Sequence, residues 1–87
     1  MNIKIITIQV AHSNNKTIGY GYDASLYESE EKLFENLSAE FEDDFAETVE
    51  FASLTYKLND DSMGTFMLDT SLTGESLVAS IKAEIEN

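Results

Sequence analysis

Few residues in this sequence could do catalytic chemistry. His12 is the only histidine, and cysteine is absent. A catalytic histidine needs a positioned nucleophile or an orienting carboxylate. Ser13 is adjacent, but neighbouring residues of a strand point to opposite faces. The glycines form no phosphate-binding loop, because none lies in a strand-to-helix turn with a lysine following. The sequence therefore predicts a protein that is not an enzyme and has neither catalytic residues nor a cofactor.

Metal binding is the next chemistry to test, since carboxylates abound. Residues 59–64 have the composition of a calcium loop, but an EF-hand needs ligands at alternate positions and a glutamate at the twelfth. Here the fifth position is Met63 and the twelfth is Thr70. Asp43 and Asp44, together with Glu47, would hold a divalent ion only weakly. We therefore expect no metal site and interpret 59–62 as a hairpin turn.

Acidic residues are concentrated in one part of the chain. Seventeen acids stand against five bases, all lysine, and the formal net charge is −12 over 87 residues. Most of the acids lie between Glu28 and Glu50, where Lys32 is the only base. Charges this dense repel one another, which suggests that they are kept for a use. The sequence predicts a partner-binding surface made of Glu31, Glu35, Glu42, Asp43, Asp44 and Glu47.

Helical spacing would place Glu31, Glu35 and Glu42 on one flank of a helix. The first and last of these stand about 16 Å apart at 1.5 Å per residue. Duplex DNA carries one charge per roughly 1.7 Å of axis, which is a closer spacing than that of these three glutamates. Other acidic residues would have to lie between them for the surface to imitate phosphates. Such a surface suits a groove built for nucleic acid.

In size and charge, over the whole chain, the sequence resembles small acidic phage-encoded inhibitors of the DNA-mimic, anti-restriction and anti-CRISPR type. No motif carries the resemblance, so it transfers no residue roles. It implies an inhibitor that occupies the basic nucleic-acid-binding surface of a host defence nuclease or another nucleic-acid enzyme. The partner would be a basic protein, because a charge of −12 repels nucleic acid and anionic membrane.

Two alternatives remain open on the sequence. An immunity protein or antitoxin for a basic toxin would need the same surface. A small adaptor or assembly module would carry its charge only for solubility and would pair exposed strand edges with a partner or a second copy, as a monomer or homodimer. We expect a cytoplasmic protein, in the host cell if a phage encodes it, because the sequence shows neither a signal peptide nor an apolar run of about 20 residues.

The positions of these residues depend on two predicted strand–strand–helix units. Alternating apolar residues predict strands over 3–12 and 17–23, and again over 48–58 and 63–69. Ser29 is the expected N-cap of a helix that runs to about Ala46. Thr73 is the expected cap of the last helix. The apolar stripes of the two helices comprise Leu33, Phe34, Leu37, Phe41 and Phe45, and Leu77, Val78, Ile81 and Ile85.

The two units, 1–46 and 47–87, align at an offset of 46 residues and predict a tandem repeat within a single domain, 1–87. The expected fold is α+β, with a four-stranded, mostly antiparallel sheet and both helices on one face. A shift of the apolar phase at Ile5–Ile6 and at Phe51–Ala52 predicts a β-bulge or a switch of face. The residues expected to face outwards from the sheet are Lys4, Thr7, Gln9, Thr17, Gly19, Gly21, Ser53, Thr55, Lys57, Thr65 and Met67.

Overall fold

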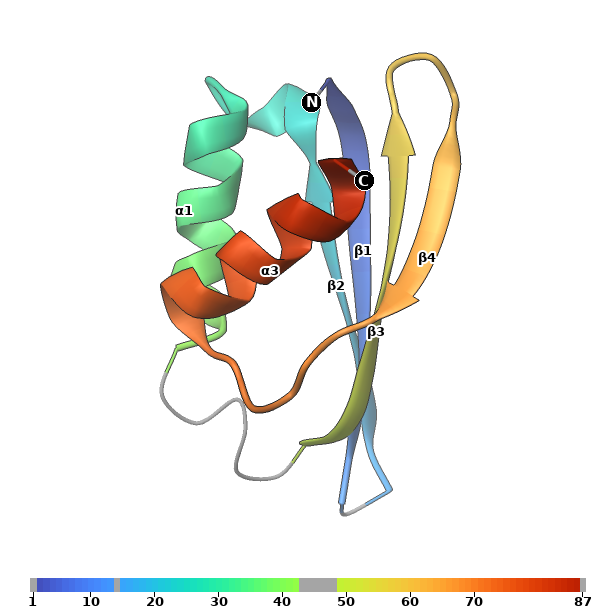
Figure 1. Ribbon diagram of the computed structural model, residues 1–87, viewed down its shortest axis with the longest axis vertical. Coiled ribbons are helices and arrows are strands. Elements are labelled where there is room, and N and C mark those ends of the chain that lie inside the picture. Colours follow the sequence, from blue (N-terminus) through green and yellow to red (C-terminus); the bar gives the residue numbers. More distant parts are fainter. Residues whose placement is uncertain (1, 14, 43–48, 87) are drawn as a thin grey trace.

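The computed structural model describes residues 2–13, 15–42 and 49–86, which form an α+β fold (Figure 1). One four-stranded antiparallel sheet, in the order β2-β1-β3-β4, is formed by β1 (Ile3–His12), β2 (Thr17–Asp23), β3 (Val49–Leu58) and β4 (Met63–Met67). The other elements are the short 3₁₀ turn η1 (Ala24–Leu26) and the helices α1 (Glu30–Glu40) and α3 (Gly74–Glu86). The predicted sheet and helices are confirmed.

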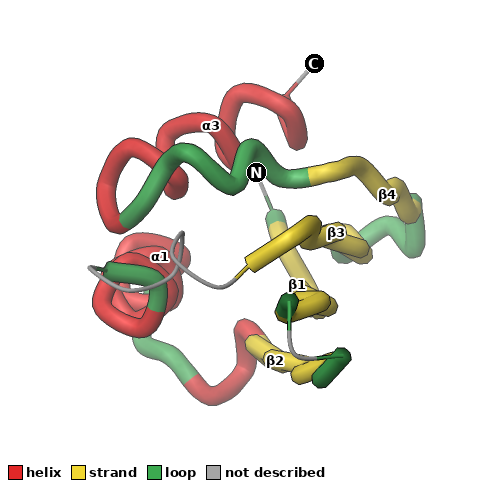
Figure 2. The backbone as a smooth tube through the Cα atoms, turned by 90° about the horizontal axis from the view of Figure 1, so that it is seen from below, coloured by secondary structure: helices red, strands yellow, loops and turns green. Residues whose placement is uncertain are grey.

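Both helices cover the same face of the sheet, and the hydrophobic core lies between the two layers (Figure 2). The residues predicted for the apolar stripes of α1 and α3 are buried, apart from Phe45, which lies outside the described residues. From the sheet they meet Ile6, Ile8 and Leu54, which are fully buried. None of the residues predicted to face outwards is buried. The sheet therefore has one covered face and one open face.

The two hairpins share one register and one turn. Asn15 and Asp61 adopt positive φ angles of 67° and 69°, which asparagine and aspartate tolerate better than most residues. In the first turn the amide of Asn15 donates to the carbonyl of His12 at 3.1 Å, and in the second Asp61 donates to Leu58 at 2.9 Å. These pairs stand 46 residues apart, as do the two hairpin registers. Descent of the two halves from one repeated unit stays a prediction.

A β-bulge lies near the start of each central strand. Lys4 in β1 and Glu50 in β3 are the extra residues at the two points where the register of the β1–β3 ladder shifts. The first bulge lets Ile3 and Ile6 both point into the core, whereas Ile5 is 38% exposed. The predicted shift of apolar phase is therefore a bulge, and it falls one residue earlier than the sequence indicated.

Helix α1 is shorter than the sequence predicted. It begins after Ser29, whose hydroxyl accepts a hydrogen bond from the amide of Lys32 at 3.2 Å, so the predicted cap is confirmed. It ends at Glu40 and not near Ala46, because the backbone of Phe41 departs from helical geometry, with φ −108° and ψ 36°. The carbonyl of Phe41 accepts a hydrogen bond from the amide of Gly74 at 2.8 Å. The remainder of the predicted helix, 43–46, lies outside the described residues.

Strand β4 ends earlier than the sequence predicted, whereas α3 begins where the sequence predicted. Strand β4 ends at Met67, before the predicted end at 69, although the amide of Leu68 still donates to Ala52 of β3 at 2.8 Å. Helix α3 begins at Gly74, directly after Thr73. The backbone carbonyl of Thr73 accepts the first hydrogen bonds of this helix, from Ser76 and Leu77.

We expect Gly64→Ala to destabilise the fold and Gly21→Ala to stabilise it slightly. A Cβ at Gly64 would stand 2.5 Å from the hydroxyl of its cross-strand neighbour Tyr56, whose ring also packs against Phe66. A Cβ at Gly21, on the opposite edge strand, meets nothing within 4 Å. Overpacking of this kind costs about 1–3 kcal/mol, whereas alanine in a compatible backbone tends to add about 0.4–1 kcal/mol. Urea unfolding measures both, and equal stabilities for the two variants would contradict the packing described.

Candidate functional site

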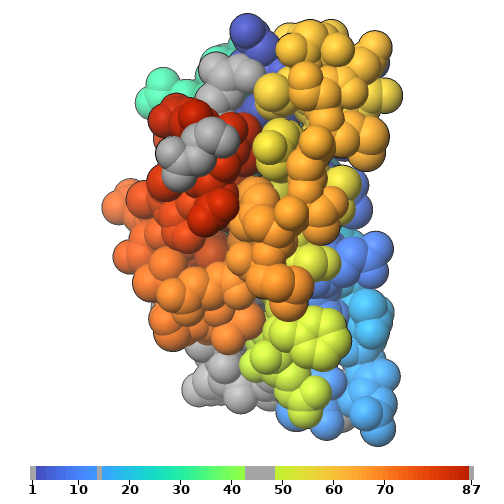
Figure 3. All heavy atoms as spheres, turned by 45° about the vertical axis from the view of Figure 1, so that its right-hand side comes forward, coloured from blue at the N-terminus to red at the C-terminus, as the bar shows by residue number. Residues whose placement is uncertain are grey.

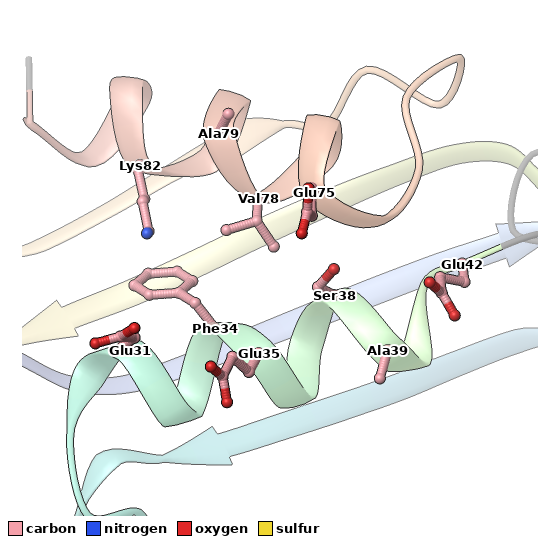
Figure 4. Close-up of a pocket in the computed structure, with 10 residues that line it drawn as sticks. All are labelled: Glu31, Phe34, Glu35, Ser38, Ala39, Glu42, Glu75, Val78, Ala79 and Lys82. Atoms are coloured by element: carbon pink, nitrogen blue, oxygen red, sulfur yellow. The ribbon is translucent and has the colours of Figure 1, made fainter.

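A groove of about 510 Å³ runs between α1 and α3 on the outer side of the helix layer (Figure 4). Its floor contains the ring of Phe34 and the side chain of Val78, and its rim is acidic. Four glutamates line it: two come from α1, one from the turn that follows α1, and one from the first turn of α3. The complete lining is Glu31, Phe34, Glu35, Ser38, Ala39, Glu42, Glu75, Val78, Ala79 and Lys82.

The position of the rim follows from the amphipathic pattern of α1. Leu33 and Leu37 are fully buried and fix the face of the helix that meets the sheet. Glu31 and Glu35 lie on the flank beside that face and line the groove, and Figure 4 shows both on α1. The acids in the first turn also interact favourably with the positive end of the helix dipole. One of them, Glu30, accepts a hydrogen bond from the amide of Ile3 at 2.8 Å and so ties the helix start to β1.

The structure brings together three of the six residues predicted for the partner-binding surface. Glu31, Glu35 and Glu42 are exposed and line the same groove. Glu42 lies beyond the end of α1, so its place on the groove comes from the turn that follows the helix and not from helical spacing. The other three, Asp43, Asp44 and Glu47, lie outside the described residues.

Seven of the ten residues that line the groove were not predicted as part of a site, among them Glu75, Lys82 and Phe34. Glu75 and Lys82 stand three residues before and four after Val78, which is the spacing that puts side chains on one flank of a helix. That signal was readable in α3, but it gains meaning only when α3 is known to pack beside α1. Phe34 was predicted as a core residue. It is 3% exposed, and its ring also forms part of the groove floor.

A cation already lies in this groove. The ammonium of Lys82 stands 4.9 Å from the centre of the Phe34 ring, within the range of a cation–π interaction. On the rim, Lys32 pairs with Glu35 at 3.3 Å, but both side chains are more than half exposed and the pair contributes little. The groove therefore holds an alkylammonium group over an aromatic ring, and carboxylates line the same groove.

The end of α1 is fastened to β2 by a buried tyrosine. Tyr22 is 2% exposed, and its hydroxyl donates a hydrogen bond to Oε2 of Glu40 in the last turn of the helix. Burial, and then this hydrogen bond, raise the pKa of Tyr22 well above its usual range. Next to it, the rings of Tyr20 and Phe41 meet edge to face with centres 4.8 Å apart. These contacts hold the helix that carries most of the rim.

A scan against protein-family models, a search of curated proteins and a search of solved structures find no match for this chain. The charge and geometry of the groove are therefore the features that bear on function. Within residues 2–13, 15–42 and 49–86, no three carboxylate or histidine side chains are grouped closely enough to hold a metal ion. No helix in the same residues has the length and apolar character needed to cross a membrane.

The raised pKa of Tyr22 predicts a loss of stability at alkaline pH. Its contribution is fully present below the unfolded-state pKa of about 10 and is lost as the pH rises above that value, because only the unfolded chain then releases the proton. Urea unfolding between about pH 8 and about pH 11 should show this loss in the parent and less of it in Tyr22→Phe. The difference in slope should reach up to about 1.4 kcal/mol per pH unit. Tyr27→Phe, which keeps Tyr22, is the control, and equal slopes for parent and Tyr22→Phe would refute the linkage.

Proposed function

We propose that this chain is an acidic protein-binding inhibitor that occupies the basic nucleic-acid-binding surface of a host defence nuclease or another nucleic-acid enzyme. The observation that carries the proposal is the convergence of Glu31, Glu35 and Glu42 with Glu75 around one groove. Glu31, Glu35 and Glu42 were predicted from the sequence by their charge, and Glu75 comes from the other half of the chain. The protein acts by binding a basic partner, in the cytoplasm of the host, and not by catalysis.

The groove supplies both parts of a lysine- or arginine-binding surface. Such side chains pack an apolar stem while their charged head stays in a polar environment. The exposed alanines Ala39 and Ala79 offer apolar surface for the stem beside the buried Phe34 and Val78. The rim carboxylates take the place of phosphates for the head. The net charge of −12 speeds association with a positively charged cleft and makes the rate sensitive to salt.

The test starts from a bacterial lysate passed over the immobilised chain at low salt. A nucleic-acid-binding enzyme should be retained, and it should elute with duplex DNA or with raised salt. The captured enzyme is then purified, and its nucleic-acid binding is measured with and without the chain. Inhibition that added DNA overcomes supports the proposal. A captured toxin without nucleic-acid binding would favour the immunity-protein alternative, and a partner indifferent to both salt and DNA would contradict mimicry.

Neutralising the rim should weaken binding more than removing the same charge elsewhere. The groove variant combines Glu31→Gln, Glu35→Gln and Glu42→Gln. The matched control combines Glu28→Gln, Glu50→Gln and Glu84→Gln, all exposed residues outside the groove lining. Three exposed ion pairs at about 0.5 kcal/mol each predict an affinity at least about tenfold lower for the groove variant. Calorimetric titration against the captured enzyme measures both, and equal losses would assign the effect to net charge alone.

Removing the resident cation should strengthen binding. Lys82→Gln frees the ring of Phe34 and leaves the rim carboxylates for the partner's own cations. Lys16→Gln, at the first hairpin turn, makes the same change in net charge away from the groove. The dissociation constant should fall several-fold for Lys82→Gln and by less for the control. An unchanged or weaker affinity for Lys82→Gln would show that partner side chains do not enter over Phe34.

A further inference from the structure

The outer edge of β4 is open to another strand. Among the described residues, β4 is the last strand of the sheet and pairs with β3 alone. The backbone groups of Ser62 and Leu68 face β3. The amide of Leu58 donates to the carbonyl of Ser62, and the amide of Leu68 donates to the carbonyl of Ala52, each at 2.8 Å. Because the pattern alternates, the amides and carbonyls of Met63, Thr65 and Met67 point away from β3. A second strand would bond at these three residues.

This edge lacks the features that usually prevent strand addition. Strands at sheet edges are commonly protected by charged residues, proline or bulges. The segment Met63–Met67 contains no charged residue and no proline, and its register with β3 is regular. The side chains of Met63 and Met67 are 65% and 62% exposed on the open face of the sheet. In Figure 3 the segment runs along the visible surface of the molecule.

The opposite edge, at β2, is less suited to pairing. By the same alternation, its outward-pointing backbone groups belong to Thr17, Gly19, Gly21 and Asp23. Two of these residues have no side chain and one is charged, so an added strand would find little apolar surface there. Helix α1, with most of the groove rim, also lies at this side, as the bond from Tyr22 to Glu40 shows. The β4 edge is therefore the apolar edge and the one remote from α1.

We propose that two copies of the chain pair through their β4 edges, antiparallel about a two-fold axis at Thr65. The pattern Met63-x-Thr65-x-Met67 reads the same in both directions about its centre. An antiparallel pair centred on Thr65 therefore sets Met63 of each copy opposite Met67 of the other. The contact is self-complementary and closes as a symmetric dimer. It joins two sheets of four strands into one continuous sheet with all helices on one side.

The charge of the chain gives this dimer a distinctive response to salt. Two copies of charge −12 repel each other at long range, and salt screens that repulsion. Dimerisation should therefore strengthen as salt is raised, whereas binding of a basic partner to the groove should weaken. The dimer does not depend on the proposed function. The opposite responses to salt distinguish dimerisation from binding of a basic partner.

Sedimentation velocity of the full chain, over a range of concentrations at low and high salt, measures the association. We expect a species of twice the 9.7 kDa chain mass, with a larger fraction at high salt. Thr65→Lys places two like charges at the axis and should give a monomer. Thr17→Lys makes the same change on the β2 edge and should still dimerise. Circular dichroism checks that both variants are folded.

Crosslinking tests the position of the axis directly, because the chain contains no cysteine. Opposed residues in such a hydrogen-bonded pair have Cα atoms about 5.5 Å apart. Thr65→Cys should therefore form a covalent dimer with a short bis-maleimide, and Thr17→Cys should not. A parent that stays monomeric at high concentration and high salt overturns the proposal. Association that persists in Thr65→Lys also overturns it. Open-ended association that is lost in Thr17→Lys overturns it as well, because that result would indicate pairing of β4 with β2.

Discussion

The antiparallel pairing of β1 with β3 is the interaction on which the rest of the structure depends. It is the only ladder of the described sheet that joins the two halves of the chain. At its centre Ile8 stands opposite Leu54, and both are fully buried. Because each of these strands also pairs with the next strand along the chain, this ladder fixes the strand order. It also places the helix that follows each hairpin over the same face of the sheet.

The acidic groove is a result of that arrangement. Each helix must bury an apolar stripe against the sheet, and one sheet face of four strands accommodates two helices side by side. The flanks of the stripes then face each other, and whatever residues the sequence places there form a shared surface. In this chain the flanks bring Glu31 and Glu35 of α1 to Glu75 and Lys82 of α3. The concentration of acids in the first half is thus extended by the second half.

Much of the fold could be predicted from the sequence because its signals are local. Alternation gave the strands, the stripes of α1 and α3 gave the helices, and a phase shift near Ile5 indicated a bulge. The end of α1 could not be predicted in this way, because Phe41 leaves the helix to bury its ring beside Tyr20 and to accept a hydrogen bond from Gly74. For the site, the sequence predicted Glu31, Glu35 and Glu42 by charge. Glu75, Lys82 and Phe34 required knowledge of which helices are neighbours, which no local pattern contains.

The shared hairpin register has a consequence for how the chain folds. Each hairpin closes through a short turn, so its contacts form between residues close in sequence, whereas the β1–β3 ladder joins residues several tens of positions apart. Loop-closure entropy makes such distant pairing the slow event. Hairpin formation would then precede the meeting of the halves. The groove draws on both helices, so the complete groove would exist only after that last step.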